Sequence, residues 1–170
     1  KNPDLDLLRH SASDLIVDHF PDGIPDEFNS RQVATTHGFL VVCADTRLES
    51  IAENREQLNR MPFIGYHREL IHHKLQQQAL NELGLEPNWN AFVERVDAIL
   101  ALVGAGLGFS LVGSLDKNGP VSEKVRVIPM PDNPVQFSVH AVWKRAIPTH
   151  PLVEIALKFA PRLAGDLSPQ

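Results

Sequence analysis

The segment that most constrains the fold of this chain is residues 96–113, with the sequence VDAILALVGAGLGFSLVG. Its first half predicts an amphipathic helix, because apolar side chains recur at helical spacing at Ile99, Leu100, Val103 and Leu107. The glycines that follow end this helix, and a short apolar strand is predicted at 109–112. A helix that turns through Gly-x-Gly straight into a buried strand is half of an α/β unit. The glycine turn carries no acid, base or nucleophile, so the strongest signal concerns fold rather than chemistry.

Strands and helices alternate along the rest of the chain. Apolar or alternating runs predict strands at 13–18, 31–35, 38–43, 61–65, 89–96, 125–128 and 135–143. Helical spacing predicts a long helix over 68–83, ended by Gly84 and Pro87, and residues 50–60 predict a shorter helix or ordered loop. This alternation is typical of an α/β sheet with crossover connections.

The last predicted helix begins at Pro151, where a missing backbone N–H costs nothing. It follows a predicted turn at 131–134 and the strand at 135–143. The spacing of its apolar side chains predicts an inward face made of Leu152, Ile155, Ala156, Phe159 and Leu163.

Charge and cysteine content narrow the function classes. The 170 residues include 16 basic and 21 acidic side chains, a net charge of −5, which argues against this segment gripping nucleic acid by itself. One cysteine, Cys43, excludes an internal disulfide framework and fits a reducing compartment. No stretch resembles a signal peptide or a membrane span. The simplest expectation is a soluble, cytoplasmic protein; the start at Lys1 leaves open that the chain is a fragment.

Two segments resemble known catalytic or cofactor-binding motifs but do not have the spacing that those motifs require. Residues 104–108 lack the G-x-G-x-x-G spacing and the strand-to-helix order of a dinucleotide site. Residues 108–113 read G-x-S-x-x-G rather than G-x-S-x-G, so Ser110 is expected to be a buried, hydrogen-bonded hydroxyl. Cys43 lies in an apolar run and is expected in the core. We therefore expect no catalytic residue and no cofactor.

A group of histidines leaves a metal site open as an alternative. His67, Glu69, His72 and His73 fall within eight residues. A zinc site needs ligands that converge, as on one face of a helix. His67 and Glu69 do not share a face, so a solvated helix surface is the favoured interpretation, and no metal is expected.

Two predicted helix starts are better candidates for binding. Tyr66, His67 and Arg68 precede the long helix, and Arg95 and Val96 begin the next one. Helix N-termini carry unpaired N–H groups and partial positive charge, and two of them beyond the ends of strands form an anion-binding crevice if they converge. Arg95 is a candidate partner for a ligand carboxylate. The alternative is that it pairs with Glu94 or Asp97 at the surface.

The ordered set of segments resembles the C-terminal effector-binding domain of LysR-type transcriptional regulators over about residues 8–163. The similar segments are SASDLIVD (11–18), GFLVVCADTRL (38–48), MPFIGY (61–66), VDAILALVGAGLGFSLVG (96–113) and VQFSVHAVWKR (135–145), followed by Pro148 and a terminal amphipathic helix. Three features depart from the family pattern. Thr46-Arg47-Leu48 stands where His-Pro-Leu is usual, Arg95 replaces a small hydroxylated residue, and a helix and loop are missing between Leu7 and Leu8.

The resemblance implies a fold of two α/β subdomains joined by two crossover strands, like a type 2 periplasmic binding protein. Subdomain I is expected at about 1–43 plus 114–170 and subdomain II at about 59–107. The family's helix-turn-helix domain is absent from this chain. The resemblance also implies a cleft that binds a small-molecule effector without transforming it, and the two helix starts with Arg95 make an anionic effector the expectation. Expected cleft residues are Phe63, Gly65, Tyr66, His67, Arg95 and Val96.

Ligand binding in such a regulator is expected to change the geometry of a homodimer or homotetramer. DNA would be bound through the helix-turn-helix domain, RNA polymerase is a further partner of such regulators, and no membrane is involved. Two other classes remain open from sequence. One is an exported solute-binding protein of the same architecture, and the other is an enzyme that uses the histidine group at 67–73 with a metal.

Overall fold

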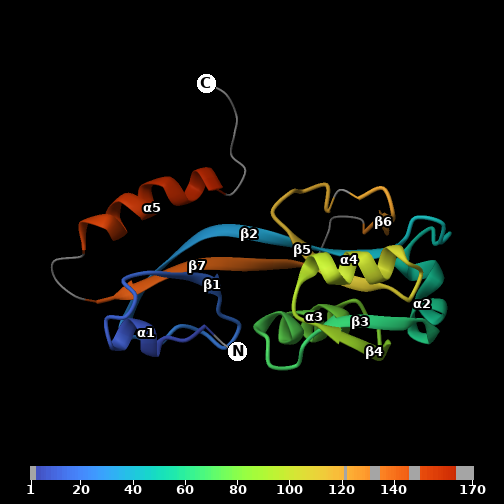
Figure 1. Ribbon diagram of the computed structural model, residues 1–170, viewed down its shortest axis with the longest axis horizontal. Coiled ribbons are helices and arrows are strands. Elements are labelled where there is room, and N and C mark those ends of the chain that lie inside the picture. The colour runs from blue at the N-terminus through green and yellow to red at the C-terminus, as the bar shows by residue number, and fades with distance from the viewer. Residues whose placement is uncertain (1–2, 121, 131–134, 146–149, 164–170) are drawn as a thin grey trace, which may run out of the picture. The chain divides into compact units, whose positions relative to one another are not determined.

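The computed structural model describes residues 3–120, 122–130, 135–145 and 150–163, with side chains to residue 159. The chain divides into two compact units. The first contains residues 1–36 and 137–170, and the second contains residues 37–136. The chain passes between them twice, inside strand β2 (Phe28–Cys43) and at the start of strand β7 (Gln136–Lys144) (Figure 1).

Strand β2 is longer than the sequence predicted. Two strands were expected, at 31–35 and 38–43, but the structure has one strand of 16 residues. Apolar and polar side chains do not alternate clearly around Thr36, His37 and Gly38. The backbone stays extended there because it remains paired with neighbouring strands, His37 with Ser114 and Gly38 with Gly113. Gly38 also accepts a close neighbour, since an added Cβ would lie 2.4 Å from a methyl carbon of Val135.

The first unit is a small antiparallel sheet with a helix on each face. Strand β1 (Ile16–His19) pairs with β7, which lies next to β2. Helix α1 (Asp6–Arg9) buries Leu8 with Phe28 and Val142. Helix α5 (Pro151–Leu163) packs on Ala141, the residue just before Val142 in β7. Because successive side chains of a strand point to opposite faces, α1 and α5 cover opposite faces of this sheet (Figure 1).

Helix α5 presents a different face from the predicted one. Its buried side chains are Val153 and Leu157, which pack with Leu15, Val33 and Trp143. The side chains expected to face inward are exposed instead, namely Leu152, Ile155, Ala156 and Phe159. The helix carries two apolar stripes, and the spacing alone does not say which one meets the sheet. The side chain of Leu163, the predicted turn at 131–134 and Pro148 lie outside the described part of the chain.

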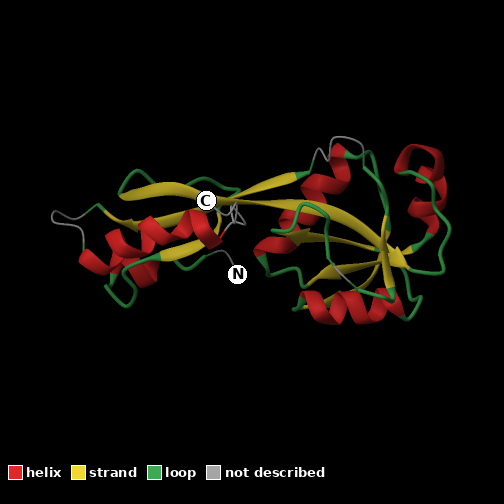
Figure 2. Cartoon of the chain, turned by 90° about the horizontal axis from the view of Figure 1, so that it is seen from above, coloured by secondary structure: helices red, strands yellow, loops and turns green. Residues whose placement is uncertain are grey.

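The second unit combines antiparallel and parallel pairing (Figure 2). Strands β5 (Ser110–Ser114) and β6 (Val125–Val127) both pair antiparallel with residues 37–43 of β2. This pairing places residues 114–136 in the second unit, whereas the sequence analysis assigned them to subdomain I. Strands β3 (Pro62–Tyr66) and β4 (Asn88–Val93) form a separate parallel pair.

Helices α2 (Ile51–Arg60), α3 (Ile71–Glu82) and α4 (Val96–Gly104) complete the second unit. Ser50 caps α2 by accepting a bond from the N–H of Glu53. The core joins α4 to the strands through the buried side chains of Phe39, Val41, Ile64, Tyr66, Ile99, Val103, Val112 and Val125. No helix in the described ranges is long and apolar enough to cross a membrane.

Helix α4 ends at the predicted Gly-x-Gly turn, and the bonds of that turn explain why. Gly106 has a φ of +78°, and its N–H donates to the carbonyl of Val103 at 2.9 Å. The N–H of Leu107 donates to the carbonyl of Leu102 at 3.2 Å, which completes a Schellman motif. Leu107 therefore lies beyond the helix and is exposed. The prediction of a helix released by glycine into a buried strand is confirmed.

Candidate functional site

Four of the six residues proposed from sequence, Tyr66, His67, Arg95 and Val96, lie at one edge of the β3–β4 pair. Tyr66 is opposite Val93 in the parallel register, and the N–H of His67 donates to the Val93 carbonyl at 2.8 Å. Helix α3 begins a few residues after β3, and α4 begins a few residues after β4. Both helix starts therefore follow strand ends that lie side by side. We call this surface, residues 66–70 and 93–97, the carboxyl edge.

Phe63 and Gly65 lie behind the carboxyl edge rather than on it. Phe63 is fully buried, with its ring 4.6 Å from the ring of Trp89 and 5.1 Å from that of Phe109, measured between centroids. Gly65 is also buried, and a Cβ added there would lie 2.4 Å from the indole ring of Trp89. The placement of these two residues favours a packing role in the strand over direct contact with a ligand.

Tyr66 is held at the end of β3 by a buried polar network that the sequence analysis missed. Its N–H donates to Gln76 Oε1 at 2.9 Å, and Gln76 Nε2 donates to the carbonyl of Leu111 at 2.7 Å. Ser110 Oγ, also buried, donates to the carbonyl of Ile64 at 2.6 Å, which confirms the prediction for this hydroxyl. The available signal was Gln76 itself, a polar residue four positions from Leu80 on the apolar face of α3.

The side chain of Tyr66 is largely shielded from water. Its ring centroid lies 5.0 Å from that of His72, and the residue is only 8% exposed. Burial raises the pKa of Tyr66 to about 12. At neutral pH the hydroxyl therefore keeps its proton and can donate a hydrogen bond.

Arg95 and Asp97 form an ion pair at the start of α4. Arg95 Nε lies 3.0 Å from Asp97 Oδ1, and Arg95 Nη2 lies 2.8 Å from Asp97 Oδ2. These bonds raise the pKa of Arg95 and lower that of Asp97. The structure thus shows the alternative in which Arg95 is paired within the protein. His67 and Val96 are exposed beside this pair.

Arg68 is the cation at the carboxyl edge that the sequence analysis passed over. It was expected at the helix start but was not among the expected cleft residues. Its guanidinium lies 4.9 Å from the centroid of the Phe92 ring, and it forms no ion pair with any residue in the described ranges. Arg68 is therefore a charge at this edge that the protein does not neutralise.

An aromatic layer lies under Arg68. Phe92 stacks on Trp89 with 6.0 Å between centroids, and His73 lies 4.6 Å from Trp89. His73 is buried, and burial lowers its pKa, opposed by a hydrogen bond with the backbone of Tyr66. Its Nδ1 has no hydrogen-bond partner among the residues that the structure describes. The neutral imidazole of His73 therefore packs against the aromatic rings, and its position does not suit a proton donor in catalysis.

The other residues considered as candidates for chemistry are Cys43 and the possible metal ligands. Cys43 is half-buried, with its thiol donating to the carbonyl of Gly104 at 3.6 Å. Within the described residues, His, Cys, Asp and Glu side chains nowhere gather in a group of three that could hold a metal ion. The carboxyl edge thus offers donors and positive charge for binding a ligand.

Solved structures share this fold. HinK, a LysR family transcriptional regulator from Pseudomonas aeruginosa, superposes with a TM-score of 0.76 at 19% identity, over 96% of this chain and 57% of HinK. The regulatory domain of Synechocystis CcmR in complex with 2-PG gives 0.74 at 12% identity, over 95% of this chain and 78% of that domain. The effector-binding domain of QuiR in complex with shikimate gives 0.73 at 14% identity, over 94% and 76%.

At these identities the likeness shows the fold alone. The chain spans just over half the length of HinK, and it spans 56% of a second Pseudomonas aeruginosa protein described as a LysR-family regulator. None of the curated proteins compared with the chain matches it.

A family model gives the more direct assignment. The model of the LysR substrate binding domain matches residues 4–164, nearly the whole chain. It agrees with the two α/β units joined by two strands and with the fold of the solved neighbours. The chain therefore belongs to the LysR substrate-binding domain family.

Proposed function

We propose that this chain is the ligand-sensing part of a LysR-type transcription regulator and that it binds a small anionic molecule at the carboxyl edge of β3 and β4. The observation that carries the proposal is the unneutralised Arg68 beside two helix starts that follow adjacent parallel strands. In open α/β sheets, ligands bind outside the carboxyl ends of strands, where helix N-termini favour negative charge. The ligands of the CcmR and QuiR domains, 2-PG and shikimate, support a small-molecule effector.

The roles of the edge residues follow from their placement. Arg68 supplies the charge that pairs with an anionic group, and the Tyr66 hydroxyl and the partial positive charge at the N-termini of α3 and α4 add to the attraction. Arg95 contributes only if its bonds to Asp97 are given up, so its part in binding is smaller. His67 and Val96 contact the body of the ligand. Phe63 and Gly65 support this edge from behind.

In the full-length regulator we propose that effector binding changes the geometry of a homodimer or homotetramer and so alters DNA binding. The helix-turn-helix domain makes the contact with DNA. RNA polymerase is a further partner of the DNA-bound regulator. The family match favours this function over an exported solute-binding protein. The proposal assigns binding and no bond-making step.

A direct test measures ligand affinity by calorimetry after a thermal-shift screen of small carboxylates and phosphates. For the compound that binds, Arg68→Gln is expected to weaken affinity about tenfold or more, because a charge-assisted hydrogen bond is lost. Arg95→Gln is expected to weaken it less. Arg60→Gln is the matched control, since Arg60 pairs with Glu56 on the exposed end of α2. Unchanged affinity in both the Arg68 and the Arg95 variants would overturn the proposal.

A further inference from the structure

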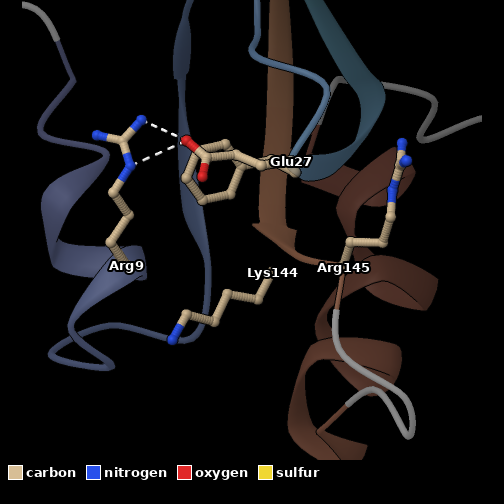
Figure 3. Close-up of a pocket in the computed structure, with 5 residues that line it drawn as sticks. Arg9, Glu27, Lys144 and Arg145 are labelled. Atoms are coloured by element: carbon tan, nitrogen blue, oxygen red, sulfur yellow. Dashed lines mark hydrogen bonds and ion pairs between the residues drawn. The ribbon is translucent and has the colours of Figure 1, made fainter.

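The first unit contains a pocket that the proposed function does not use. Its volume is about 390 Å³, and its lining comes from segments far apart in sequence, namely Arg9, Glu27, Phe28, Lys144 and Arg145 (Figure 3). Arg9 ends helix α1, Glu27 and Phe28 lie at the start of β2, and Lys144 and Arg145 lie at the end of β7. Three of the five lining side chains are cations.

The acidic groups near this pocket are already engaged by Arg9. Its guanidinium bonds Glu27 through two nitrogens, one of them at 2.9 Å, and bonds Asp6 Oδ1 at 2.7 Å. These hydrogen bonds, that of Glu27 first, raise the pKa of Arg9. The carboxylates of Glu27 and Asp6 are thus directed at Arg9 and away from the other two cations of the pocket.

Lys144 and Arg145 keep positive charge that no carboxylate of the described residues balances. Lys144 Nζ donates to the Ser11 hydroxyl at 2.9 Å, which satisfies one donor without neutralising the charge. Arg145 is exposed and makes no ion pair or hydrogen bond with the rest of the described chain. The pocket therefore carries a net positive charge on a protein whose own net charge is −5. A local excess of the opposite sign attracts anions to that place.

The pocket also has an apolar element. Phe28 is 4% exposed, and the Arg9 guanidinium lies 5.4 Å from its ring centroid. A volume of this size falls in the lower part of the range of small-molecule sites, which combine apolar walls with a few polar groups. The chemistry that fits is an organic oxyanion, a carboxylate or phosphate with a small apolar body.

We propose that this pocket is a second ligand site, which binds a small organic oxyanion through Lys144, with Arg145 adding positive charge from the rim and Phe28 as its apolar wall (Figure 3). The site lies wholly in residues of the first unit, whereas the carboxyl edge lies in the second. It extends the proposed function and does not depend on it.

The test is an NMR titration of the ¹⁵N-labelled chain with two probes, inorganic phosphate and phenylacetate. Sodium chloride at the same ionic strength is the reference for screening. Both probes are expected to shift the amides of residues 9, 27, 28, 144 and 145. Acetate is titrated as a comparison compound, and phenylacetate is expected to bind more tightly than acetate because of its aromatic body. Shifts confined to residues 66–70 and 93–97 would place binding at the carboxyl edge and overturn the second site.

Charge variants make the test specific. Lys144→Gln is expected to weaken probe affinity about threefold to fivefold, the size of one exposed charge–charge interaction, and Arg145→Gln is expected to weaken it less because its side chain is directed away from Lys144. Glu27→Gln removes the pocket's carboxylate and releases Arg9, so it is expected to strengthen binding by a similar factor. Lys158→Gln, at an exposed position of α5, makes the same charge change outside the pocket and is expected to have no effect.

Two results would contradict the proposal. Equal weakening in the Lys158 and Arg145 variants would show that the probes respond to overall charge. Unchanged or weaker binding in the Glu27 variant would show that the pocket's own electrostatics do not govern affinity. Failure of the carboxyl-edge variants to change effector affinity, with the pocket variants acting as expected, would leave this site standing without the proposed function.

Discussion

The two units bury their apolar surface in different ways. In the second unit, the apolar core is crossed by a buried polar network in which Gln76 bonds Tyr66 and Leu111. In the first unit, two small apolar clusters lie on opposite faces of a sheet, and α5 leaves a second apolar stripe exposed. A core with a polar network depends on individual residues, because each unpaired buried group is costly. In a small apolar cluster, a substitution costs only the stability of the contacts that it removes.

The largest effect is expected at the polar network. Gln76→Leu leaves the N–H of Tyr66 and the carbonyl of Leu111 without their partner, and each such group costs about 1–3 kcal/mol. We expect a loss of roughly 2–4 kcal/mol in the free energy of unfolding, measured by urea denaturation. The control is Gln78→Leu, on the exposed side of the same helix, where little change is expected. Equal losses would show that the network adds nothing.

A somewhat smaller effect is expected at Gly65. Gly65→Ala places a methyl group against the Trp89 ring, at a separation that real Cβ atoms essentially never show. Overpacking of this kind costs about 1–3 kcal/mol, detectable as a lowered Tm. Trp89→Leu in the same chain should recover part of the loss, because it makes room for the new methyl group. A double variant no more stable than the sum of the single losses predicts would remove the steric explanation.

Helix α5 gives the corresponding comparison in the first unit. Val153→Ala removes buried carbon from the contact with Ala141 and is expected to cost about 1–2 kcal/mol. Ile155→Ala, on the exposed stripe, is expected to change stability by less than about 0.5 kcal/mol. Thermal unfolding of the two variants measures the difference. The reverse order would mean that the stripe first expected from sequence is the one that packs.

The smallest effect is a pH dependence confined to the second unit. Burial lowers the pKa of His73 below its ordinary 6.5, so the folded chain binds this proton more weakly than the unfolded chain. Stability should therefore fall as the pH drops through 6.5 toward the folded pKa, and level off below it. His73→Phe should flatten this part of a stability–pH profile, whereas His10→Gln, at an exposed position, should not. A profile unchanged by His73→Phe would assign the dependence to other groups.

Much of the second unit could be predicted from sequence because its elements carry one clear signal each. Helix α4 has one apolar stripe and a glycine stop, and β3 and β4 are short runs on either side of α3. Helix α5 could not be oriented in the same way, because Val153 and Leu157 compete with Leu152, Ile155 and Phe159. Strand β2 was split in two because Thr36 and His37, between the predicted strands at 31–35 and 38–43, look like a break when the partner strands are unknown.

The candidate sites show the same division. The carboxyl edge was found because a strand end followed by a helix start is a local pattern. The partner of Arg95 could be named only as an alternative, since Glu94 and Asp97 both lie within two residues of it. The pocket in the first unit could not be anticipated, because Arg9, Glu27 and Lys144 are brought together only by the pairing of distant strands.

The pairing at the base of the second unit has a practical consequence for protein engineering. The N–H of Gly38 bonds the carbonyl of Val135 at 2.8 Å, so the two ends of this unit are neighbours. A segment whose ends meet can be excised, or its ends joined and reopened elsewhere, without stretching the chain. Residues 37–136 thus define a natural cassette for transplantation between homologous scaffolds.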